Sequence, residues 1–445
     1  MCIRGGPEFR SFNLEGHLLV IVRALYGLKT SGARWHERFA DTLRLEGFTP
    51  CKADTDVWMR LAGDSYEYIC VYVDDLAMAM KDPAAFCSVL QKQYNYKLKG
   101  VGDLTYHLGC DFGRDPDGTF FYAPYKYIEK ILAGYERIFG ASPSPATSPL
   151  VKNDHPELDT SPELDLQGRS TYMSLIGQCQ WLISLGRFDI SCAIMTMSRF
   201  RVAPRVGHLD RLKRIFGYIK KFPHGAIRIR TGIPDYSDLV EPDYTWASIY
   251  GPISEELPHD MPTPLGKPVL TTTYEDANLY HDFLTGRSVT GVLHLINQTP
   301  VDWYCKRQAT VETATFGSEF NAARTATEQI IDLRYTLRML GVPLLRSYMF
   351  GDNQSVLLNS TVPSSQLNKR HNALAYHRVR EAVAAKLMYF FWMAGKNNPS
   401  DVVSKHCGFA DAWPKLKPLL FWRGDTSSLI PVKGELQAVP RDPVR

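Results

Sequence analysis

The strongest constraint in the sequence is an apolar run at residues 68–80 that carries two adjacent carboxylates, Asp74 and Asp75, at its centre. The Val, Ile and Tyr residues of this run favour a strand buried on both faces, where an unpaired charge would be costly. The two aspartates are therefore expected at the tip of a hairpin. A turn lets both carboxylates approach one Mg²⁺ site, although an ordinary Asp-Asp turn is the simpler alternative.

Length and composition limit the class of protein. A chain of 445 residues suggests about two to four domains, and its 44% apolar content is enough to bury cores. No apolar run approaches the roughly 18 residues of a membrane span, and the first ten residues lack the features of a signal peptide. The nine cysteines form no C-x-x-C pair, which predicts reduced thiols. We expect a cytoplasmic protein, with the nucleus as the alternative, and no membrane partner.

Local patterns predict the elements around the aspartate run. Apolar runs favour strands at 18–22 and 56–61. Helical spacing favours one helix from Ser31 to Gly47 and another at 83–94. The strand at 56–61 is expected to pair with the aspartate hairpin.

Several motifs resemble the reverse transcriptase of copia-type LTR retrotransposons. They occur in that family's order at residues 24–29 with Trp35, 52–54, 72–75, 106–109, 125–128, 172–177, 187–190 and 198–200. Each motif alone is weak, but the ordered set is strong. The resemblance extends from about residue 1 to about residue 408. It implies that Asp74 and Asp75 hold catalytic Mg²⁺ in a polymerase palm.

The resemblance also implies a third palm aspartate on an earlier strand. The sequence has no Asp before Asp41, and Asp41 lies in the helix predicted after Lys29. Two-metal phosphoryl transfer needs carboxylates that are shared between the ions, so we expect this chain alone not to extend a primer. Lys29 and Arg34 are the expected phosphate-facing residues of this part.

A basic stretch follows a Pro-, Ser- and Asp-rich segment at 140–168, which is expected to be a linker or long loop. Ten basic residues lie between 199 and 230, against the single acid Asp210. A solvated helix face is the usual meaning of such a run, but the near absence of acids favours contact with a phosphate backbone. The expected contacts are Arg211, Lys213, Arg214, Lys220 and Lys221.

The last part resembles ribonuclease H, which follows the polymerase in the copia family. The predicted order is strands at 269–276, 289–297 and 300–306, a helix ending at Gly341, a strand at 347–351, a helix at 371–386 and a strand at 388–393. The motifs that carry the resemblance are Trp303 with 306–308, then 318–320, 351–355 and 369–371.

Four acids fall on the catalytic positions of that family: Asp276, Glu319, Asp352 and Asp401. The resemblance implies that they hold Mg²⁺, with Mn²⁺ as a substitute. Simpler alternatives are helix N-caps for Asp352 and Asp401, a helix-dipole role for Glu319 and a strand-end turn for Asp276. Four acids that can converge at one sheet, with no cationic partner nearby in sequence, favour the metal site.

One histidine matches the same family. His371 resembles a residue that assists product release, and a plain helix-start histidine is an equal alternative. Asn372 stands where the family usually has Asp. Glu312 is expected to be exposed.

We therefore predict an α+β chain with a partial polymerase palm and thumb, followed by an RNase H-like α/β domain with a mixed five-stranded sheet. The predicted parts are a palm lacking its first catalytic strand at 1–139, a helical and basic thumb or connection at 140–230, a linker or insertion at 231–268, the RNase H-like domain at 269–425 and a tail at 426–445.

The predicted function is that of a retrotransposon-derived reverse transcriptase and RNase H fragment, which cleaves RNA in RNA–DNA hybrids and has lost polymerase function. One alternative is a polymerase that works when the missing N-terminal part is supplied. Another is a non-catalytic remnant that binds nucleic acid. The expected partners are an RNA–DNA hybrid, a single-stranded RNA template and the remainder of a Pol polyprotein.

Overall fold

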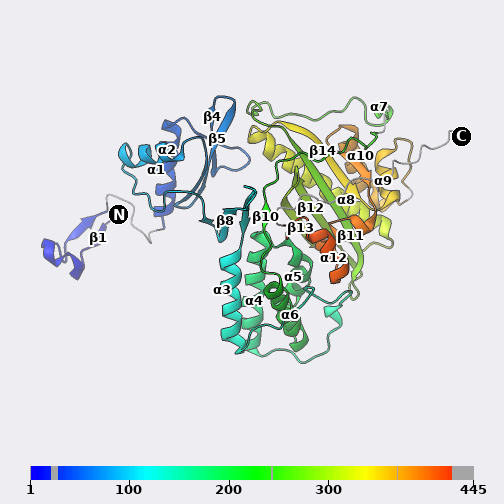
Figure 1. Cartoon of the computed structure of the whole chain (residues 1–445), viewed down its shortest axis with the longest axis horizontal. Helices are drawn as coiled ribbons and strands as arrows, with labels where there is room; N and C mark the ends of the chain where they lie inside the picture. The colour runs from blue at the N-terminus through cyan, green and yellow to red at the C-terminus, as the bar shows by residue number, and fades with distance from the viewer. Residues whose placement is uncertain (1, 22–28, 242–243, 368, 423–445) are drawn as a thin grey trace. The chain divides into compact units, whose positions relative to one another are not determined.

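The structure is a computed structural model that describes residues 2–21, 29–241, 244–367 and 369–422 (Figure 1). Its contacts divide the chain into two compact units, one of residues 1–103 with 339–341 and one of 104–338 with 342–445. Several predictions fall outside the described residues. They are the motif residues 24–28, the end of the first predicted strand at Val22, the last residues 423–425 of the predicted RNase H-like domain, and the tail at 426–445.

The first unit contains an antiparallel sheet of four strands in the order β3-β4-β5-β6. Apolar side chains of α1 and α2, among them Leu43 and Leu90, pack with Trp58 and Ile69 of the sheet. The predicted helices, strand and hairpin are confirmed here. The elements are β1 (Cys2–Arg4), β2 (Leu18–Val20), α1 (Ser31–Leu45), β3 (Thr49–Pro50), β4 (Val57–Ala62), β5 (Ser65–Tyr72), β6 (Asp75–Ala79) and α2 (Pro83–Lys92).

The second unit begins with a small antiparallel sheet, in the order β10-β9-β8-β7, and a group of helices. Helices α3, α4 and α6 lie side by side in Figure 1. Each contributes a side chain to one shared core: Ile131 from α3, Leu175 from α4 and Ile215 from α6. The elements are β7 (Tyr106–His107), β8 (Cys110–Arg114), β9 (Phe120–Ala123), α3 (Tyr125–Phe139), α4 (Leu166–Ser184), α5 (Ser191–Met197), α6 (Val206–Lys221) and β10 (Ile227–Arg228).

The rest of the second unit is built on a mixed five-stranded sheet in the order β13-β12-β11-β14-β15. Strands β11, β12 and β13 are antiparallel, whereas β14 runs parallel to β11 and β15 runs parallel to β14. This confirms the predicted RNase H-like sheet. The elements are β11 (Val269–Asp282), β12 (Arg287–Ile296), β13 (Thr299–Arg307), α8 (Thr315–Met339), β14 (Leu344–Gly351), α9 (Gln354–Thr361), α10 (Ala373–Ala384), β15 (Tyr389–Trp392), α11 (Asp401–Ser404) and α12 (Phe409–Leu416).

Both faces of this sheet are covered because neighbouring strand residues point to opposite sides. On one face, Val292 packs with residues of α8, α9 and α10. On the other face, Leu293 packs with Val403 of α11 and also with Phe188 and Ile227 from the preceding part of the chain. The RNase H-like sheet therefore shares one of its cores with the helical part of the same unit.

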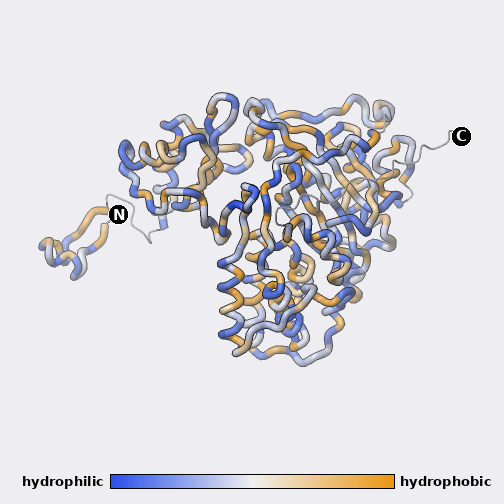
Figure 2. Tube along the Cα trace, in the orientation of Figure 1, coloured by the Kyte–Doolittle hydropathy of each residue, from blue (hydrophilic) through white to orange (hydrophobic). Residues whose placement is uncertain are grey.

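The segment at 231–268 contains the short helix α7 (Ala247–Tyr250) and is attached to the sheet domain. Glu255 pairs with Arg334 and Arg338 of α8, and Tyr236 is buried with its hydroxyl 3.0 Å from Thr272 Oγ1. Hydrophobic and hydrophilic residues alternate along α3, as expected for a helix that buries one face (Figure 2). In the part of the chain that the structure describes, no helix is long and apolar enough to cross a membrane.

Candidate metal centre

Three of the four predicted acids meet at the central strand of the five-stranded sheet. Asp276 lies on β11, Asp352 directly follows the neighbouring strand β14, and Glu319 comes from α8. One carboxylate oxygen from each lies within 4.8 Å of the other two. Glu319 Oε2 accepts a 3.0 Å hydrogen bond from the backbone N–H of Ala277, which fixes this carboxylate beside Asp276.

The simpler structural roles proposed for these acids are wrong. Asp276 is not at a strand end, because β11 continues to Asp282. Helix α9 is capped by Asn353, whose side chain accepts a 3.1 Å hydrogen bond from the N–H of Val356, so Asp352 is free of that role. Asp401 is the first residue of α11, after the cap residue Ser400, and Glu319 lies beyond the first turn of α8.

The electrostatics of the three acids favour the uptake of protons or cations. Burial, followed by repulsion from Asp276, raises the pKa of Asp352 to about 6. Burial is also the main cause that raises the pKa of Asp276 and, well above its usual range, that of Glu319. Because Asp276 is fully buried, its charge must be balanced by a partner within the protein or by a bound ion.

Asp401 does not join the three acids, and two lysines that the sequence analysis did not consider hold it. Lys405 Nζ lies 2.8 Å from Asp276 Oδ1 and 2.6 Å from Asp401 Oδ1, so it bridges them. Lys415 pairs with the other oxygen of Asp401. The expectation that no cation is nearby in sequence was wrong, since Lys405 follows Asp401 by four residues, a spacing that brings side chains together on a helix.

A further buried acid, Glu275, precedes Asp276 and also escaped the sequence analysis. Its side chain points to the opposite face of β11, and its Oε2 has no hydrogen-bond partner among the described residues. Burial and then the nearby Asp276 raise its pKa well above the usual range. A β-carbon at Gly351 would come within 2.2 Å of Glu275 Oε1, so this close approach requires glycine.

His371 lies beside Glu312 and does not contact Asp276, Glu319 or Asp352 in the described residues. Its ring is 56% exposed, and Nε2 lies 3.2 Å from Glu312 Oε2. Glu312 is only 4% exposed, so the expectation that it is a surface residue was wrong. Asn372 is buried at the start of α10. A role of His371 in product release stays a prediction.

The aspartate hairpin of the first unit has the predicted form. Tyr72 pairs with Asp75 as the last rung of β5 and β6, and the turn is formed by Val73 and Asp74. Val73 has a φ of 56°, a left-handed conformation that is unfavourable for a β-branched residue. Both aspartates are exposed, and among the described residues no third metal-ligating side chain joins them. Their catalytic role stays a prediction.

The predicted phosphate contacts of the same unit, Lys29 and Arg34, are both exposed. Lys29 lies just before Thr30, the N-cap residue of α1, and Arg34 lies in the first turn of this helix. Both side chains are thus accessible to a ligand, and their contact with phosphate stays a prediction.

The basic stretch at 199–230 is paired with acids from other parts of the chain. Arg211 forms two hydrogen bonds to Asp154, of 2.8 and 2.9 Å, and one of 2.7 Å to Asp159. Lys213 pairs with Asp210, and Arg214 donates to Ser148. Lys220 and Lys221 are exposed on α6. Counting acids only inside the stretch missed these long-range partners, and the nucleic-acid interface stays a prediction.

Two sets of substitutions separate structural from binding roles in this stretch. Arg211→Gln is expected to lower the free energy of unfolding by about 1–3 kcal/mol, because Asp154 and Asp159 lose their partner. Lys220→Gln with Lys221→Gln should leave stability nearly unchanged and lower the slope of log affinity against log salt by about 2. Urea denaturation and nucleic-acid titrations at several salt concentrations measure the two effects. An unchanged salt slope in the double variant would contradict the binding role.

Comparisons with known proteins show which families this chain is similar to. Residues 3–148 match the family model described as reverse transcriptase (RNA-dependent DNA polymerase). A putative transposon Ty5-1 protein of Saccharomyces cerevisiae is 30% identical over 262 residues, which cover 58% of this chain and 80% of that protein. The retrovirus-related Pol polyprotein from transposon RE1 of Arabidopsis thaliana is 24% identical over 401 residues, or 90% of this chain and 25% of the polyprotein.

Solved structures are also similar to part of the chain. The N-terminal RNase H domain of a Mycobacterium tuberculosis protein covers 33% of this chain and 96% of its own, at 9% identity and a TM-score of 0.24. RNase H1 from Halobacterium salinarum covers 33% and 98%, at 13% identity and a TM-score of 0.23.

The order and directions of the five strands define an RNase H-like domain, and the residues before it match a reverse transcriptase. The chain belongs to the copia-type retrotransposon family of reverse transcriptases with an RNase H-like domain. It spans about a quarter of the length of the RE1 polyprotein.

Proposed function

We propose that the second unit is a metal-dependent nuclease that cleaves the RNA strand of RNA–DNA hybrids. The observation that carries this proposal is the convergence of Asp276, Glu319 and Asp352, whose carboxylate oxygens lie within 4.8 Å of one another. Carboxylate oxygens are the ligands that Mg²⁺ and Mn²⁺ prefer. Burial, together with repulsion between acids, raises the pKa of all three, so a bound cation would stabilise their charged forms. The residues therefore fit a divalent cation.

Hydrogen bonds from one backbone group and two side chains hold these ligands in place. The N–H of Ala277 orients Glu319, and the indole N–H of Trp392 donates a 2.8 Å hydrogen bond to the backbone carbonyl of Asp352. Ser404 donates to Asp276. When bound, Mg²⁺ or Mn²⁺ would activate water and neutralise charge on the scissile phosphate. The three acids would serve as ligands of this ion. Asp401 is connected to the group by Lys405, which contacts both Asp276 and Asp401.

Lys405 serves as the counter-charge of Asp276 and Asp401 when the site holds no metal. Lys405→Met is expected to lower the free energy of unfolding in EDTA by about 2–4 kcal/mol, because a buried carboxylate loses its partner. Mg²⁺ should restore part of this loss, so the variant should gain more from Mg²⁺ than the wild type. Thermal denaturation with and without Mg²⁺ measures the difference. Lys417→Met, at an exposed lysine of the same region, is the matched control, and an equal Mg²⁺ effect in both variants would contradict the role.

The test of the proposed function uses the whole chain and an end-labelled RNA annealed to DNA. We expect RNA cleavage in Mg²⁺ or Mn²⁺, none in EDTA, and none of the same RNA as a single strand. Cleavage that persists in EDTA, or no cleavage of the hybrid in either metal, would contradict the proposal. The remainder of a Pol polyprotein is the proposed covalent context, since the RE1 relative named above is a Pol polyprotein.

A second candidate function is RNA-directed DNA synthesis on a single-stranded RNA template. The exposed aspartates at the β5–β6 turn and the reverse transcriptase match over residues 3–148 favour it. We propose that this activity needs a further acidic ligand from outside the described residues. Primer extension by a longer chain that carries an upstream palm strand, compared with the present chain, tests this; equal extension by both would contradict the need for the added ligand.

A further inference from the structure

A second group of metal-ligating side chains lies in the same unit, and the nuclease proposal does not use it. Cys192 of α5, His281 near the end of β11 and His406 after α11 each place one ligand atom within 4.8 Å of the other two. All three residues are at most 8% exposed. The group is thus a buried sulfur and nitrogen cluster formed by three segments that are distant in the sequence.

The distances suit a small tetrahedral metal ion. Cys192 Sγ lies 3.6 Å from His406 Nδ1. Bonds of about 2.3 Å to sulfur and about 2.0 Å to nitrogen, at a tetrahedral angle, place these two ligand atoms about 3.5 Å apart. The two imidazole rings are neighbours, with centroids 4.8 Å apart and planes tilted by 59°. Ligands of these types match Zn²⁺ and not Mg²⁺, which prefers oxygen.

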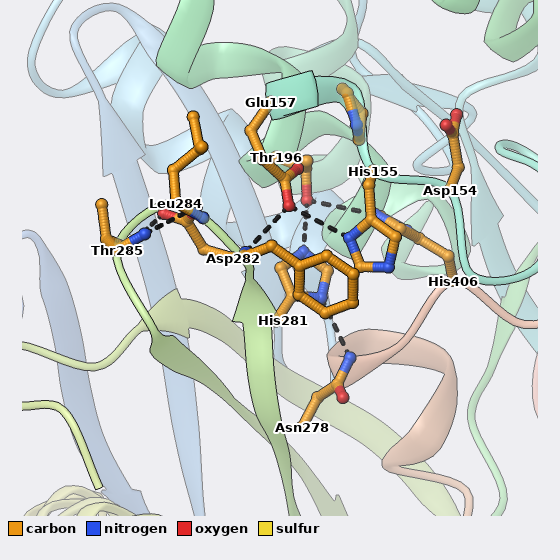
Figure 3. A network of polar contacts seen from close by, with 12 residues as sticks. Asp154, His155, Glu157, Thr196, Asn278, His281, Asp282, Leu284, Thr285 and His406 are labelled. Atoms are coloured by element: carbon orange, nitrogen blue, oxygen red, sulfur yellow. Dashed lines mark hydrogen bonds and ion pairs between the residues drawn. The ribbon is translucent and has the colours of Figure 1, made fainter. Parts of the chain in front are cut away.

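The surroundings also orient the imidazoles (Figure 3). The Asn278 side chain lies 2.9 Å from His281 Nδ1, and Thr196 Oγ1 lies 2.9 Å from His281 Nε2. In this arrangement the Asn278 amide N–H donates to Nδ1, and Nε2–H faces Thr196 Oγ1. A metal at Nε2 would need the ring proton on Nδ1, where the Asn278 amide, rotated by half a turn, would accept it through its oxygen.

A simpler account is a closed hydrogen-bond network. Thr196 Oγ1 contacts His281 and also lies 3.4 Å from His406 Nε2, so one hydroxyl can satisfy both rings. In that account the Cys192 thiol donates to His406 Nδ1, and the same 3.6 Å separation also fits two ligands of one metal ion. A second thiol, Cys305 of β13, contacts Cys192 through a side-chain hydrogen bond but lies outside the group of three ligand atoms that meet within 4.8 Å.

We propose that Cys192, His281 and His406 bind a zinc ion that ties α5 to β11 and to the segment after α11. On binding, the S–H bond of Cys192 breaks, its proton leaves to solvent, and the sulfur keeps the electron pair that forms the bond to zinc. No oxidation or reduction takes place. The zinc ion holds the helical part of the second unit against the RNase H-like sheet.

The experiment measures metal on the purified whole chain and needs no nuclease activity. After expression with added zinc and extensive dialysis, we expect about one zinc ion per chain by mass spectrometry of the metal content. Replacement of zinc by Co²⁺ should give the strong near-ultraviolet absorption of a thiolate–cobalt bond. The cluster of Asp276, Glu319 and Asp352 contains no sulfur, so metal bound there cannot produce this band.

Variants assign the ligands. Cys192→Ser should abolish the cobalt–thiolate band, and His406→Gln should reduce the retained zinc at least about tenfold. Asn278→Ala should weaken zinc binding by about 10–100-fold, because this residue only positions His281. Cys179→Ala changes an equally buried cysteine of the helical core and should leave the band unchanged.

The wild-type measurement alone can overturn the inference if a variant fails to fold. A wild-type chain that holds no zinc after zinc-supplemented expression, and that shows no thiolate band with Co²⁺, would mean that these residues form only a hydrogen-bond network. A band that survives in Cys192→Ser would mean that another thiol binds the metal. Either result leaves the nuclease proposal unaffected.

Discussion

Replacing Asp352 with asparagine is expected to reduce hybrid cleavage by at least about 100-fold while leaving the fold intact. The substitution keeps the size of the side chain and removes one of the three charges that would hold the metal. Helix α9 keeps its cap because that role belongs to Asn353. Cleavage rates with Mg²⁺ in excess, and circular dichroism of the purified variant, measure the two expectations.

The same variant is expected to be more stable than the wild type when metal is absent. The native protein binds the Asp352 proton more tightly than the unfolded chain does, since its pKa is raised from 3.8 to about 6. Stability of the metal-free wild type therefore falls as the pH rises from about 4 to about 6, and the loss stays above that range. Asparagine has no proton to lose. The advantage of Asp352→Asn should thus grow over this interval to about 3 kcal/mol at most.

Denaturation of both proteins in EDTA, from acid to neutral pH, tests this sign. Asp332→Asn changes an exposed acid of α8 and is the matched control, with no expected effect on cleavage or on the pH profile. Near-normal cleavage by Asp352→Asn would remove this residue from the metal site. An advantage in stability that shrinks towards neutral pH would contradict the raised pKa.

Replacing Arg187 with methionine is expected to produce the largest loss of stability, about 3–5 kcal/mol. Arg187 and Asp189 are both completely buried and share hydrogen bonds of 2.9 and 2.8 Å. The Tyr218 hydroxyl also donates to Asp189, at 2.8 Å. Without the guanidinium, the Asp189 charge would remain in an apolar core with only Tyr218 as partner. Urea denaturation, compared between the variant and the wild type, measures the loss.

The double variant Arg187→Met with Asp189→Leu should recover more than half of that loss, because no unpaired charge remains. Arg378→Met breaks an exposed pair with Glu328 and should cost less than about 1 kcal/mol. If the double variant were less stable than Arg187→Met alone, packing of the arginine stem would be the main contribution and the argument from buried charge would fail.

The sequence was sufficient for features that depend on local pattern. The helix from Ser31, the β5–β6 turn and the five strands of the RNase H-like sheet follow from apolar spacing, which determines which face of an element is buried. Motif positions also identified Asp276, Glu319 and Asp352. These acids come together because a central strand, its parallel neighbour and the helix between them bring residues of fixed spacing to one place.

Features that depend on long-range partners could not be predicted in the same way. Arg211 lies in a stretch that contains almost no acid, yet Asp154 and Asp159 neutralise it from more than 50 positions away. The burial of Glu312 and the pairing of Lys415 with Asp401 likewise depend on tertiary packing. Local composition records how polar a segment is and does not specify which distant charge it meets.

The shared core on one face of the five-stranded sheet has a consequence for how such elements can recombine. Phe188 and Ile227 lie in the same core as Leu293 and Leu420. An exchange that joined a foreign RNase H-like domain at residue 269 would replace one side of this core and set Phe188 and Ile227 against side chains of unmatched shape. The contacts divide the chain at residue 104 instead. The RNase H-like domain is therefore expected to be inherited most easily together with the helices that precede it, as one block.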